Sequence, residues 1–412
     1  MLDGAADLLL ERQEERRHDT GLPEPRIRVQ CASRLAELDA HAEAWDRLAY
    51  FAPQRAPMLS HAWVSSYLEH LLKPGESWFC LLAYAGPDLL GVLPVVSSSG
   101  RSVLARGKLC HAPDDLDVWT GDMLAAKGRG REVAAALLDE FTRLRPDYAA
   151  LKLNKLPPGS QSPHIIEDGF GGRRVLGEPA GQGAFLRIGG SHKDYIKSLS
   201  ANFKSNLKRA NKRLAGLGGV ETHFLTGEAP SGEHMRLFFD LEASGWKGRA
   251  GSAILSCERH TAFFSTLVRR LRARGMLEWH LLQAGGKLIA GHLAVRTHNK
   301  LTIWKLAYDE ELSQCAPGNM LFERLVHRSY AEGGVDEIDL VSDFAWYSKW
   351  RMERRPYRNL IISPPELTPY LGNLAALKAR AGLRRLKEEV KKSPALSAAA
   401  YRVRDLARRI GR

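Results

Sequence analysis

The chain has 412 residues, which is more than one domain usually holds, so two domains are expected. With 44% hydrophobic and 26% charged residues it has a globular composition, which excludes wholesale disorder. No apolar run reaches the ~18 residues of a membrane span, and the start lacks a secretory pattern, so a cytoplasmic protein is expected.

Charge and cysteine content narrow the function classes further. The net charge is +13, and residues 366–412 alone carry twelve Lys/Arg against four Asp/Glu. Such a tail fits an anionic neighbour, which is nucleic acid, an acidic membrane face or an acidic partner, although a merely solvated tail is equally compatible. The five cysteines are scattered without a CxxC pair, which excludes a zinc ribbon and argues against a disulfide scaffold.

The first half is predicted to be mixed α/β. Residues 1–24 form a flexible lead-in that ends in a Gly-Leu-Pro-Glu-Pro stretch. Periodicity and turn signals then predict helices over 35–48, 63–72 (capped by Ser60) and 131–144, and strands over 78–85, 89–96 and 148–153. A Gly-rich stretch at 169–183 precedes the end of this domain, predicted near residue 190.

The second half continues the mixed pattern. A long helix is expected from a Ser191–Asp194 capping pair to about Leu217, with Lys and Arg on its outer face. Further helices are predicted over 232–244, 260–274 and 318–331, and strands over 220–225, 277–284, 287–297, 301–308 and 337–341, with Gly285-Gly286 as a hairpin turn. Two tail helices follow, over 371–392 and 395–410. This order predicts an α/β fold with a mixed sheet.

The stretch from 301 to 331 carries the most specific signal. An apolar strand leads through a polar loop into Pro317-Gly318, where a helix begins. Proline and glycine at a helix start leave the first backbone N–H groups unobstructed, which makes a main-chain anion site suited to a pyrophosphate. Asp114–Asp117 contains a DxD that suits a metal in a sugar transferase, but a short acidic loop is the commoner interpretation.

Four blocks in this half, taken together, resemble a known family. They are, in chain order, SLSANFKSNLKRANKRL, GWKGRAGSAI, WKLAYDEELSQCAPGNML and DLVSDFAWYSKWRMERR. In order and spacing they are similar to the CelD/BcsL-like branch of the GNAT acetyltransferase superfamily. The fold is shared with Fem-type transferases, which use aminoacyl-tRNA and consist of two tandem GNAT-like domains. The chain departs from the family in the bulky Asp343–Trp346 segment, where an acceptor is expected to sit.

The resemblance implies a domain plan and a reaction. Residues 25–190 are expected to form a degenerate GNAT-like domain, 191–363 the GNAT acyltransferase domain, and 364–412 a basic helical tail. The co-substrate is expected to be acetyl-CoA or a longer acyl-CoA, with no metal. The acceptor is expected to be an amine of a sugar, a lipid-linked saccharide or another envelope or natural-product precursor. Aminoacyl-tRNA-dependent transfer and a catalytically silent role in polysaccharide secretion remain as alternatives.

The same resemblance suggests the site residues. Donor binding is assigned to a strand and a helix start, namely Trp304, Lys305, Leu306, Ala307, Tyr308, Gln314, Gly318, Asn319 and Met320. Proton transfer and charge stabilisation are assigned to Asp309, Asp343, Tyr347 and Lys349. The acceptor side is assigned to Trp246, Lys247 and Arg249, because a glycine-flanked pair of cations can hold a carboxylate or phosphate.

Overall fold

The computed structural model describes residues 26–115, 118–166, 170–227 and 232–392. The predicted lead-in 1–24, the second tail helix 395–410 and part of the Asp114–Asp117 segment lie outside these ranges. Within them, no helix has both the length and the apolar character to cross a membrane.

The first half contains the predicted elements and several more. In chain order its elements are β1 (Ile27–Ala32), α2 (Leu35–Asp39), α3 (Ala42–Phe51), η1 (Pro57–Leu59), α4 (His61–His70), β2 (Ser77–Ala85), β3 (Asp88–Ser102), β4 (Gly107–His111), β5 (Leu124–Ala125), α5 (Gly130–Leu144), β6 (Tyr148–Leu156), α6 (Ser162–Ile166), η2 (Phe170–Gly172) and β7 (Arg174–Arg187). The expected single helix over 35–48 is wrong, because the chain turns at Ala40 and His41 and forms two helices. Ser60 caps α4 as predicted, accepting from the Trp63 N–H at 3.3 Å.

The second half follows the predicted order closely. Its elements are α7 (His192–Ser198), α8 (Ala201–Ala215), β8 (Glu221–Thr226), α9 (Gly232–Ser244), α10 (Trp246–Arg249), η3 (Ile254–Ser256), α11 (Glu258–Ala273), β9 (Leu277–Ala284), β10 (Lys287–Thr297), β11 (Lys300–Tyr308), η4 (Glu310–Cys315), α12 (Pro317–Glu332), β12 (Glu337–Asp339), η5 (Ala345–Trp350), β13 (Glu353–Ser363) and α13 (Leu367–Lys392). The long helix expected from residue 191 is two helices, because Leu199 is extended and Ser200 caps a new start.

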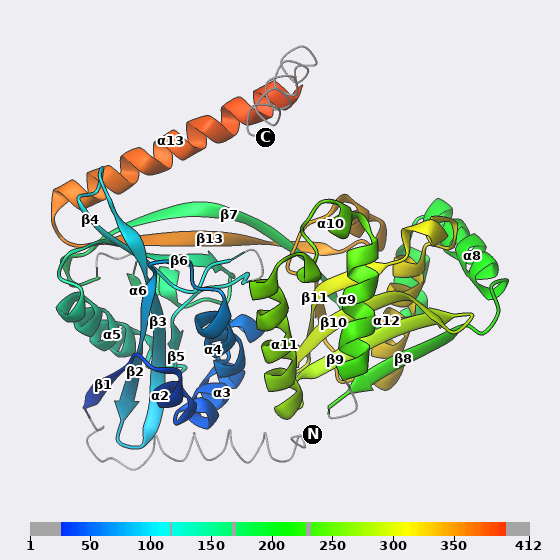
Figure 1. The fold of residues 1–412 in the computed structure, drawn as a ribbon, viewed down its shortest axis with the longest axis horizontal. Helices are drawn as coiled ribbons and strands as arrows, with labels where there is room; N and C mark the ends of the chain where they lie inside the picture. Colours follow the sequence, from blue (N-terminus) through cyan, green and yellow to red (C-terminus); the bar gives the residue numbers. More distant parts are fainter. Residues whose placement is uncertain (1–25, 116–117, 167–169, 228–231, 393–412) are drawn as a thin grey trace.

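All strands belong to one mixed sheet that runs the length of the molecule (Figure 1). Its order is β1-β2-β3-β4-β6-β13-β7-β12-β11-β10-β9-β8, with β5 beside β3. The pairs β4–β6 and β11–β12 are parallel and the remaining pairs are antiparallel. The predicted fold class, α/β with a mixed sheet, is confirmed.

The strand order reads alike from both ends, so the two halves share an architecture. Each half has antiparallel neighbours followed by one parallel crossover that contains a helix, α5 in the first half and α12 in the second. Each half then gives its last strand to the middle of the sheet, where β13 pairs with β6 and β7 pairs with β12.

These central strands bear on the predicted domain limits. β13 falls within the expected second domain, 191–363, yet Arg358–Ile362 pairs with β6 of the first half. β7, in the stretch read only as Gly-rich, is a long strand that pairs with both β13 and β12. Figure 1 shows both strands crossing from one half to the other. The limit near residue 190 therefore separates two sequence segments whose strands are interleaved.

The helices of the second half cover opposite faces of its sheet. α8 and α12 pack on one face, with a core that includes Phe203, Leu207 and Leu325. α9 and α11 cover the other face, and α11 also packs against α4 of the first half (Figure 1). At this junction Trp304 lies 4.3 Å from Trp63, between ring centroids, so one hydrophobic core spans both halves.

Candidate functional site

The candidate site begins where β11 and β12 separate. The two strands pair only from Lys300 to Thr302 and from Glu337 to Asp339. β12 then turns toward β7, since the Leu340 N–H donates to the Ala184 carbonyl at 2.9 Å. Over 303–308, one backbone edge of β11 therefore faces no strand among the described residues. Free main-chain groups beside a splayed strand can bind an extended ligand by sheet-like hydrogen bonds.

The equivalent opening in the first half is closed. There the Ala112 N–H donates to the Lys152 carbonyl, and Gly121 and Asn154 exchange two backbone hydrogen bonds at 2.7 and 2.9 Å. The segment that contains Gly121 thus occupies the edge of β6 that would otherwise be free. This contrast favours the second half as the place of binding.

The start of α12 lies at the end of the free edge. Ala316 adopts a left-handed conformation (φ 46°, ψ 52°), and Pro317 and Gly318 begin the helix. Proline has no N–H, and the Met320 N–H donates to the Ala316 carbonyl at 3.0 Å. The N–H groups of Gly318 and Asn319 have no acceptor among the described residues, so they and the helix dipole suit an anion.

Space at this helix start is limited by an aromatic ring. A Cβ added at Gly318 would lie 3.3 Å from Cδ1 of Tyr308, which is itself 38% exposed at the end of β11. Glycine at this position therefore keeps the main chain accessible beside the Tyr308 ring. Of the predicted donor residues here, Gly318 and Asn319 offer main-chain donors, whereas Met320 is buried and its N–H is used by the helix.

The remaining donor residues on β11 divide between core and edge. Trp304 is buried and stacks on Phe264 at 4.5 Å, so its side chain belongs to the shared core. Ala307 is buried, Lys305 lies over the Phe264 ring, and the Leu306 carbonyl accepts from Lys247 at 3.3 Å. Of this part of the strand, only the main-chain groups are thus placed to bind an acyl donor. Gln314 is exposed, and its carbonyl accepts from Arg213 of α8 at 3.1 Å.

The four residues predicted for proton transfer lie in two places. Asp309 caps η4 through the Glu311 N–H and pairs with Lys287 at 2.8 Å. Asp343, Tyr347 and Lys349 lie after β12, and no contact joins them to Asp309 in the described structure. Asp309 therefore has the contacts of a loop cap.

The segment after β12 places a buried phenol near the start of α12. Tyr347 is 1% exposed and its hydroxyl lies 3.0 Å from Ser342 Oγ. Burial raises the pKa of the Tyr347 phenol to about 12, so it stays protonated at neutral pH. Asp343 accepts from Gln182 at 2.6 Å and pairs with Arg354, while Lys349 is exposed.

An aromatic contact fixes this segment to the helix. Trp350 is fully buried, and its indole N–H donates to the side-chain oxygen of Asn319 at 3.0 Å. The rings of Phe203 and Phe322 pack edge-on against Trp350. Asn319 thus holds η5 with its side chain while its main-chain N–H remains at the helix start.

The structure departs from the predicted acceptor loop. Residues 246–249 form the short helix α10, in which Lys247 pairs with the buried Glu242 at 2.7 Å. Arg249 pairs with Glu310 of η4, and Glu310 also accepts from the Trp246 N–H at 2.8 Å. Both cations therefore have acidic partners within the chain. Through Glu310, α10 contacts the loop 309–316 that precedes α12, here called the donor loop. Trp246 remains 52% exposed.

Sequence reasoning missed a charged cluster at the point where β11 and β12 separate. Lys300 pairs with Asp339 at 2.6 Å, and Arg355 of β13 pairs with Glu337 at 2.5 Å. Burial opposes ionisation of Asp339, but the charges of Lys300 and Arg355 outweigh it and lower the pKa of the carboxyl. Lys300, Asp339 and Arg355, with Thr302 and Gln54, line a cavity of about 10 Å³, room for one water molecule. The alternating acids of Glu337–Asp339 were a visible signal for a charged cluster in the sequence. Their basic partners, however, come from strands that are distant in the sequence.

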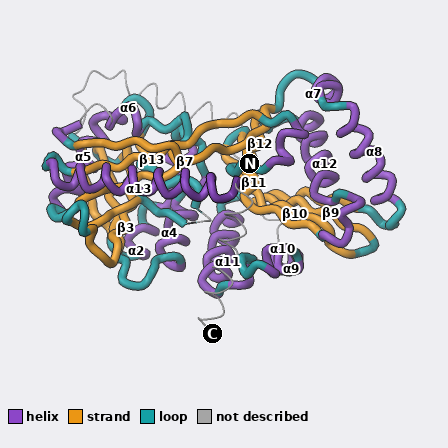
Figure 2. Tube along the Cα trace, turned by 90° about the horizontal axis from the view of Figure 1, so that it is seen from above, coloured by secondary structure: helices purple, strands orange, loops and turns teal. Residues whose placement is uncertain are grey.

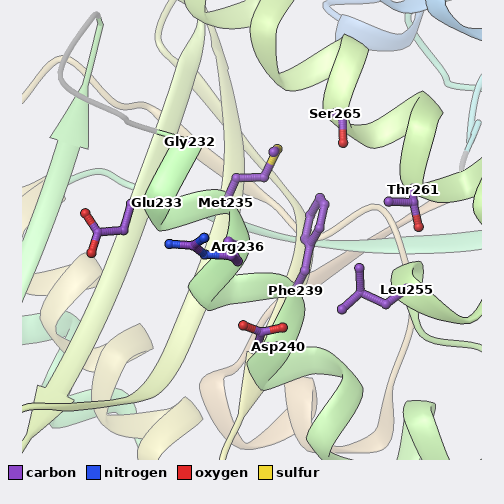
Figure 3. A pocket seen from close by; sticks show the side chains of 9 residues that line it. All are labelled: Gly232, Glu233, Met235, Arg236, Phe239, Asp240, Leu255, Thr261 and Ser265. Atoms are coloured by element: carbon purple, nitrogen blue, oxygen red, sulfur yellow. The ribbon is translucent and has the colours of Figure 1, made fainter.

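A larger groove lies between α9 and α11 (Figure 3). It has a volume of about 390 Å³, and Met235, Phe239 and Leu255 line it together with polar side chains of α9 and α11. None of the predicted site residues lines it. Nowhere in the described ranges do three or more His, Cys, Asp or Glu side chains gather as metal ligands.

The part of the chain that holds this site is similar to a known family. Residues 201–346 match the model of a family described as an acetyltransferase (GNAT) domain. The match includes the donor loop and α10, but it does not distinguish the CelD/BcsL-like branch, which stays a prediction. No curated protein matches the sequence.

Solved structures show a related fold. FemX is 12% identical, with a TM-score of 0.56 over 81% of this chain and 98% of that one. A tandem GNAT protein from the clavulanic acid biosynthesis pathway is 15% identical, with a TM-score of 0.44 over 82% of this chain and 100% of that one. The likeness to FemX extends over both halves of the chain and concerns the fold alone.

Proposed function

Because residues 201–346 match the model of an acetyltransferase (GNAT) domain, we propose that the protein transfers an acyl group from acyl-CoA to an amine. The acceptor class would be an amino sugar, a lipid-linked saccharide or another envelope or natural-product precursor. One observation carries the proposal. The unpaired edge of β11 leads directly to a helix start with free N–H groups at Gly318 and Asn319.

The residues present fit an acyl-CoA. Its pyrophosphate would lie at the start of α12, where main-chain donors and the helix dipole favour negative charge. Its pantetheine arm would run along residues 303–308 of β11. An amine attacks a thioester directly, so the chain needs to hold donor and acceptor together, accept a proton and stabilise the leaving sulfur.

Among the predicted residues, we take Tyr347 as the proton donor. Its phenol stays protonated at neutral pH and belongs to the segment fixed to α12 through Trp350 and Asn319. We assign it the protonation of the leaving thiolate. Asp343 is the proposed route for the amine proton, through water, because its carboxylate is partly exposed and belongs to the same segment as Tyr347, whereas Asp309 is buried and caps η4.

Trp246 is the residue of the predicted acceptor loop that remains free for an acceptor. Its ring is exposed on α10, beside the donor loop, where it would stack on a sugar face. Lys247 and Arg249 would contribute indirectly, by holding α10 to Glu242 and Glu310.

A second candidate is transfer from an aminoacyl-tRNA. It is supported by the FemX-like fold and by the exposed basic face of α8, where Arg213 reaches the donor loop. Lys208, Arg209 and Lys212 continue this face, which suits a polyanion. A catalytically silent component of a polysaccharide system is the third candidate, and it predicts donor binding without turnover.

The donor separates these candidates. Native mass spectrometry of the purified protein with acetyl-CoA, longer acyl-CoAs and charged tRNA should show a complex with an acyl-CoA. A panel of amino sugars and amine-bearing envelope precursors should then yield an acylated product by mass. Product from charged tRNA alone would favour the second candidate, and tight acyl-CoA binding without any product across the panel would favour the third.

A further inference from the structure

The turn between β3 and β4 exposes apolar side chains that the fold does not use. Val103 is 89% exposed and Leu104 is 61% exposed, whereas the next residue, Ala105, is buried. Two bulky apolar residues at a protruding turn have no role in the core. Exposed apolar residues in such a place mark a surface that meets another apolar phase.

This turn lies against the beginning of α13. A Cβ added at Gly372 would lie 2.3 Å from the Leu104 carbonyl oxygen, so the turn and the helix are in close contact. Asn373 anchors the same part of α13, donating to the Ala149 carbonyl at 2.8 Å and to Ser363 Oγ at 3.0 Å. Beyond this anchor the helix rises away from the sheet (Figure 1), and seen from above it runs over the region of β7 and β13 (Figure 2).

The face of α13 that meets the turn continues along the helix as an apolar stripe. Small and apolar residues recur at steps of four and three, at Gly372, Ala376, Ala379 and Leu383. Such steps keep side chains on one helix face. Leu383, roughly 16 Å along the axis from Gly372 at the usual helical rise, is 59% exposed.

Basic residues flank this stripe. α13 carries seven Lys/Arg against two Glu, and Lys378, Arg380 and Arg385 are exposed. Arg106 is exposed beside the apolar turn. An apolar stripe flanked by cations is the pattern of a helix that lies in a membrane interface.

We propose that the β3–β4 turn and the apolar face of α13 form a surface that binds an anionic lipid bilayer. Val103 and Leu104 would enter the headgroup region, and the cations of α13 would meet the lipid phosphates. A second copy of the chain is a poorer occupant, because pairing two copies of α13 would bring like charges together. This surface is separate from the donor site, so the proposal does not depend on the reaction.

The test is sedimentation of the full chain with vesicles of phosphatidylcholine and phosphatidylglycerol in equal parts, and with phosphatidylcholine alone. Val103→Asp and Leu383→Asp place charge in the apolar surface at exposed positions. Leu217→Asp is the matched control, since Leu217 is an exposed leucine (41%) in the turn after α8. A Lys378→Gln/Arg380→Gln/Arg385→Gln variant tests the charge, and circular dichroism with thermal melting confirms folding of each variant.

The wild-type protein should bind the anionic vesicles in a salt-sensitive way and bind phosphatidylcholine weakly. Val103→Asp and Leu383→Asp should each weaken the partition constant at least fivefold, the triple variant should lose most of the salt sensitivity, and Leu217→Asp should match the wild type. The proposal would be overturned if both Asp variants bound the anionic vesicles as tightly as the wild-type protein does. It would also be overturned by a dimer in analytical ultracentrifugation that Leu383→Asp dissociates, because the stripe would then belong to a second copy.

Discussion

Glu310 joins two segments that lie far apart in the sequence. It accepts from the Trp246 N–H and pairs with Arg249, so α10 is held to the loop that begins the donor site. The hydrogen bond and charge of Arg249 lower the pKa of the Glu310 carboxyl. Arg249 thus acts on the loop through Glu310, rather than as a free cation for an acceptor.

A double-mutant cycle tests this arrangement. Arg249→Ala and Glu310→Gln should each change the free energy of unfolding slightly, with a small coupling between them, because the Arg249 side chain is 63% exposed. Both variants should change the KM for acyl-CoA in the same direction. A large rise in acceptor KM for Arg249→Ala alone would show instead that Arg249 contacts the acceptor, as the sequence predicts.

Residue roles were predictable where they depend on the main chain. Pro317-Gly318 indicates an unobstructed helix start, because proline lacks an N–H and glycine lacks a Cβ, and the structure has that start. Roles assigned to charged side chains were harder to predict. Lys247, Arg249 and Asp309 have ion-pair partners up to 61 positions away, and single-sequence spacing carries no information about such pairs.

At the scale of elements, local patterns predicted the hairpins and amphipathic helices well. Gly285 and Gly286 both have positive φ (56° and 76°), as a two-residue hairpin turn between β9 and β10 requires. β7 and β13 were missed. β7 is rich in glycine and β13 contains Pro356, so neither has the usual strand composition, and both are stabilised by long-range pairing with each other.

Helix α4 contains a buried histidine that should make stability depend on pH. Burial, together with the charge of Arg274, outweighs the carboxylates of Asp46 and Asp39 and lowers the pKa of His61 to about 4. Arg274 Nη2 lies 3.2 Å from His61 Nδ1, and since Arg only donates, Nδ1 accepts and the neutral ring is protonated on Nε2.

As the pH falls, His61 takes up a proton near pH 6.5 in the unfolded chain, and only at a lower pH in the folded chain. The free energy of unfolding therefore keeps its full value above pH 6.5. It decreases as the pH falls toward 4, by an amount on the order of 3 kcal/mol. Urea unfolding of the wild type and His61→Gln across this range should show a steeper loss for the wild type. Parallel curves would mean that His61 titrates alike in both states.

At the scale of the whole molecule, the halves are interleaved rather than linked. β13 pairs with β6, β7 pairs with β12, and Arg259 of α11 donates to three carbonyls at the end of α4, those of His70, Leu71 and Leu72. The resemblance predicted the tandem architecture. The exchange of strands between the halves could not be predicted in this way, because no local sequence pattern indicates it.

A fragment spanning residues 191–363, the predicted second domain, should not fold cooperatively. It would lose β6 beside β13, β7 beside β12, and α4 beside α11, which would expose Trp304 and Phe264. Calorimetry should show no sharp transition for the fragment and a single one for the full chain. A sharp transition in the fragment would mean that the second half is an independent domain.

The central claim is that the start of α12 binds the pyrophosphate of an acyl-CoA, and calorimetric titration with CoA tests it most directly. Gly318→Ala adds only a Cβ beside the Tyr308 ring, whereas Gly318→Asp adds a negative charge as well. The aspartate variant should bind CoA at least tenfold more weakly than the alanine variant, about 1.4 kcal/mol, with both folded by thermal melting. Equal CoA affinity in the two variants would show that the pyrophosphate does not lie at this helix start.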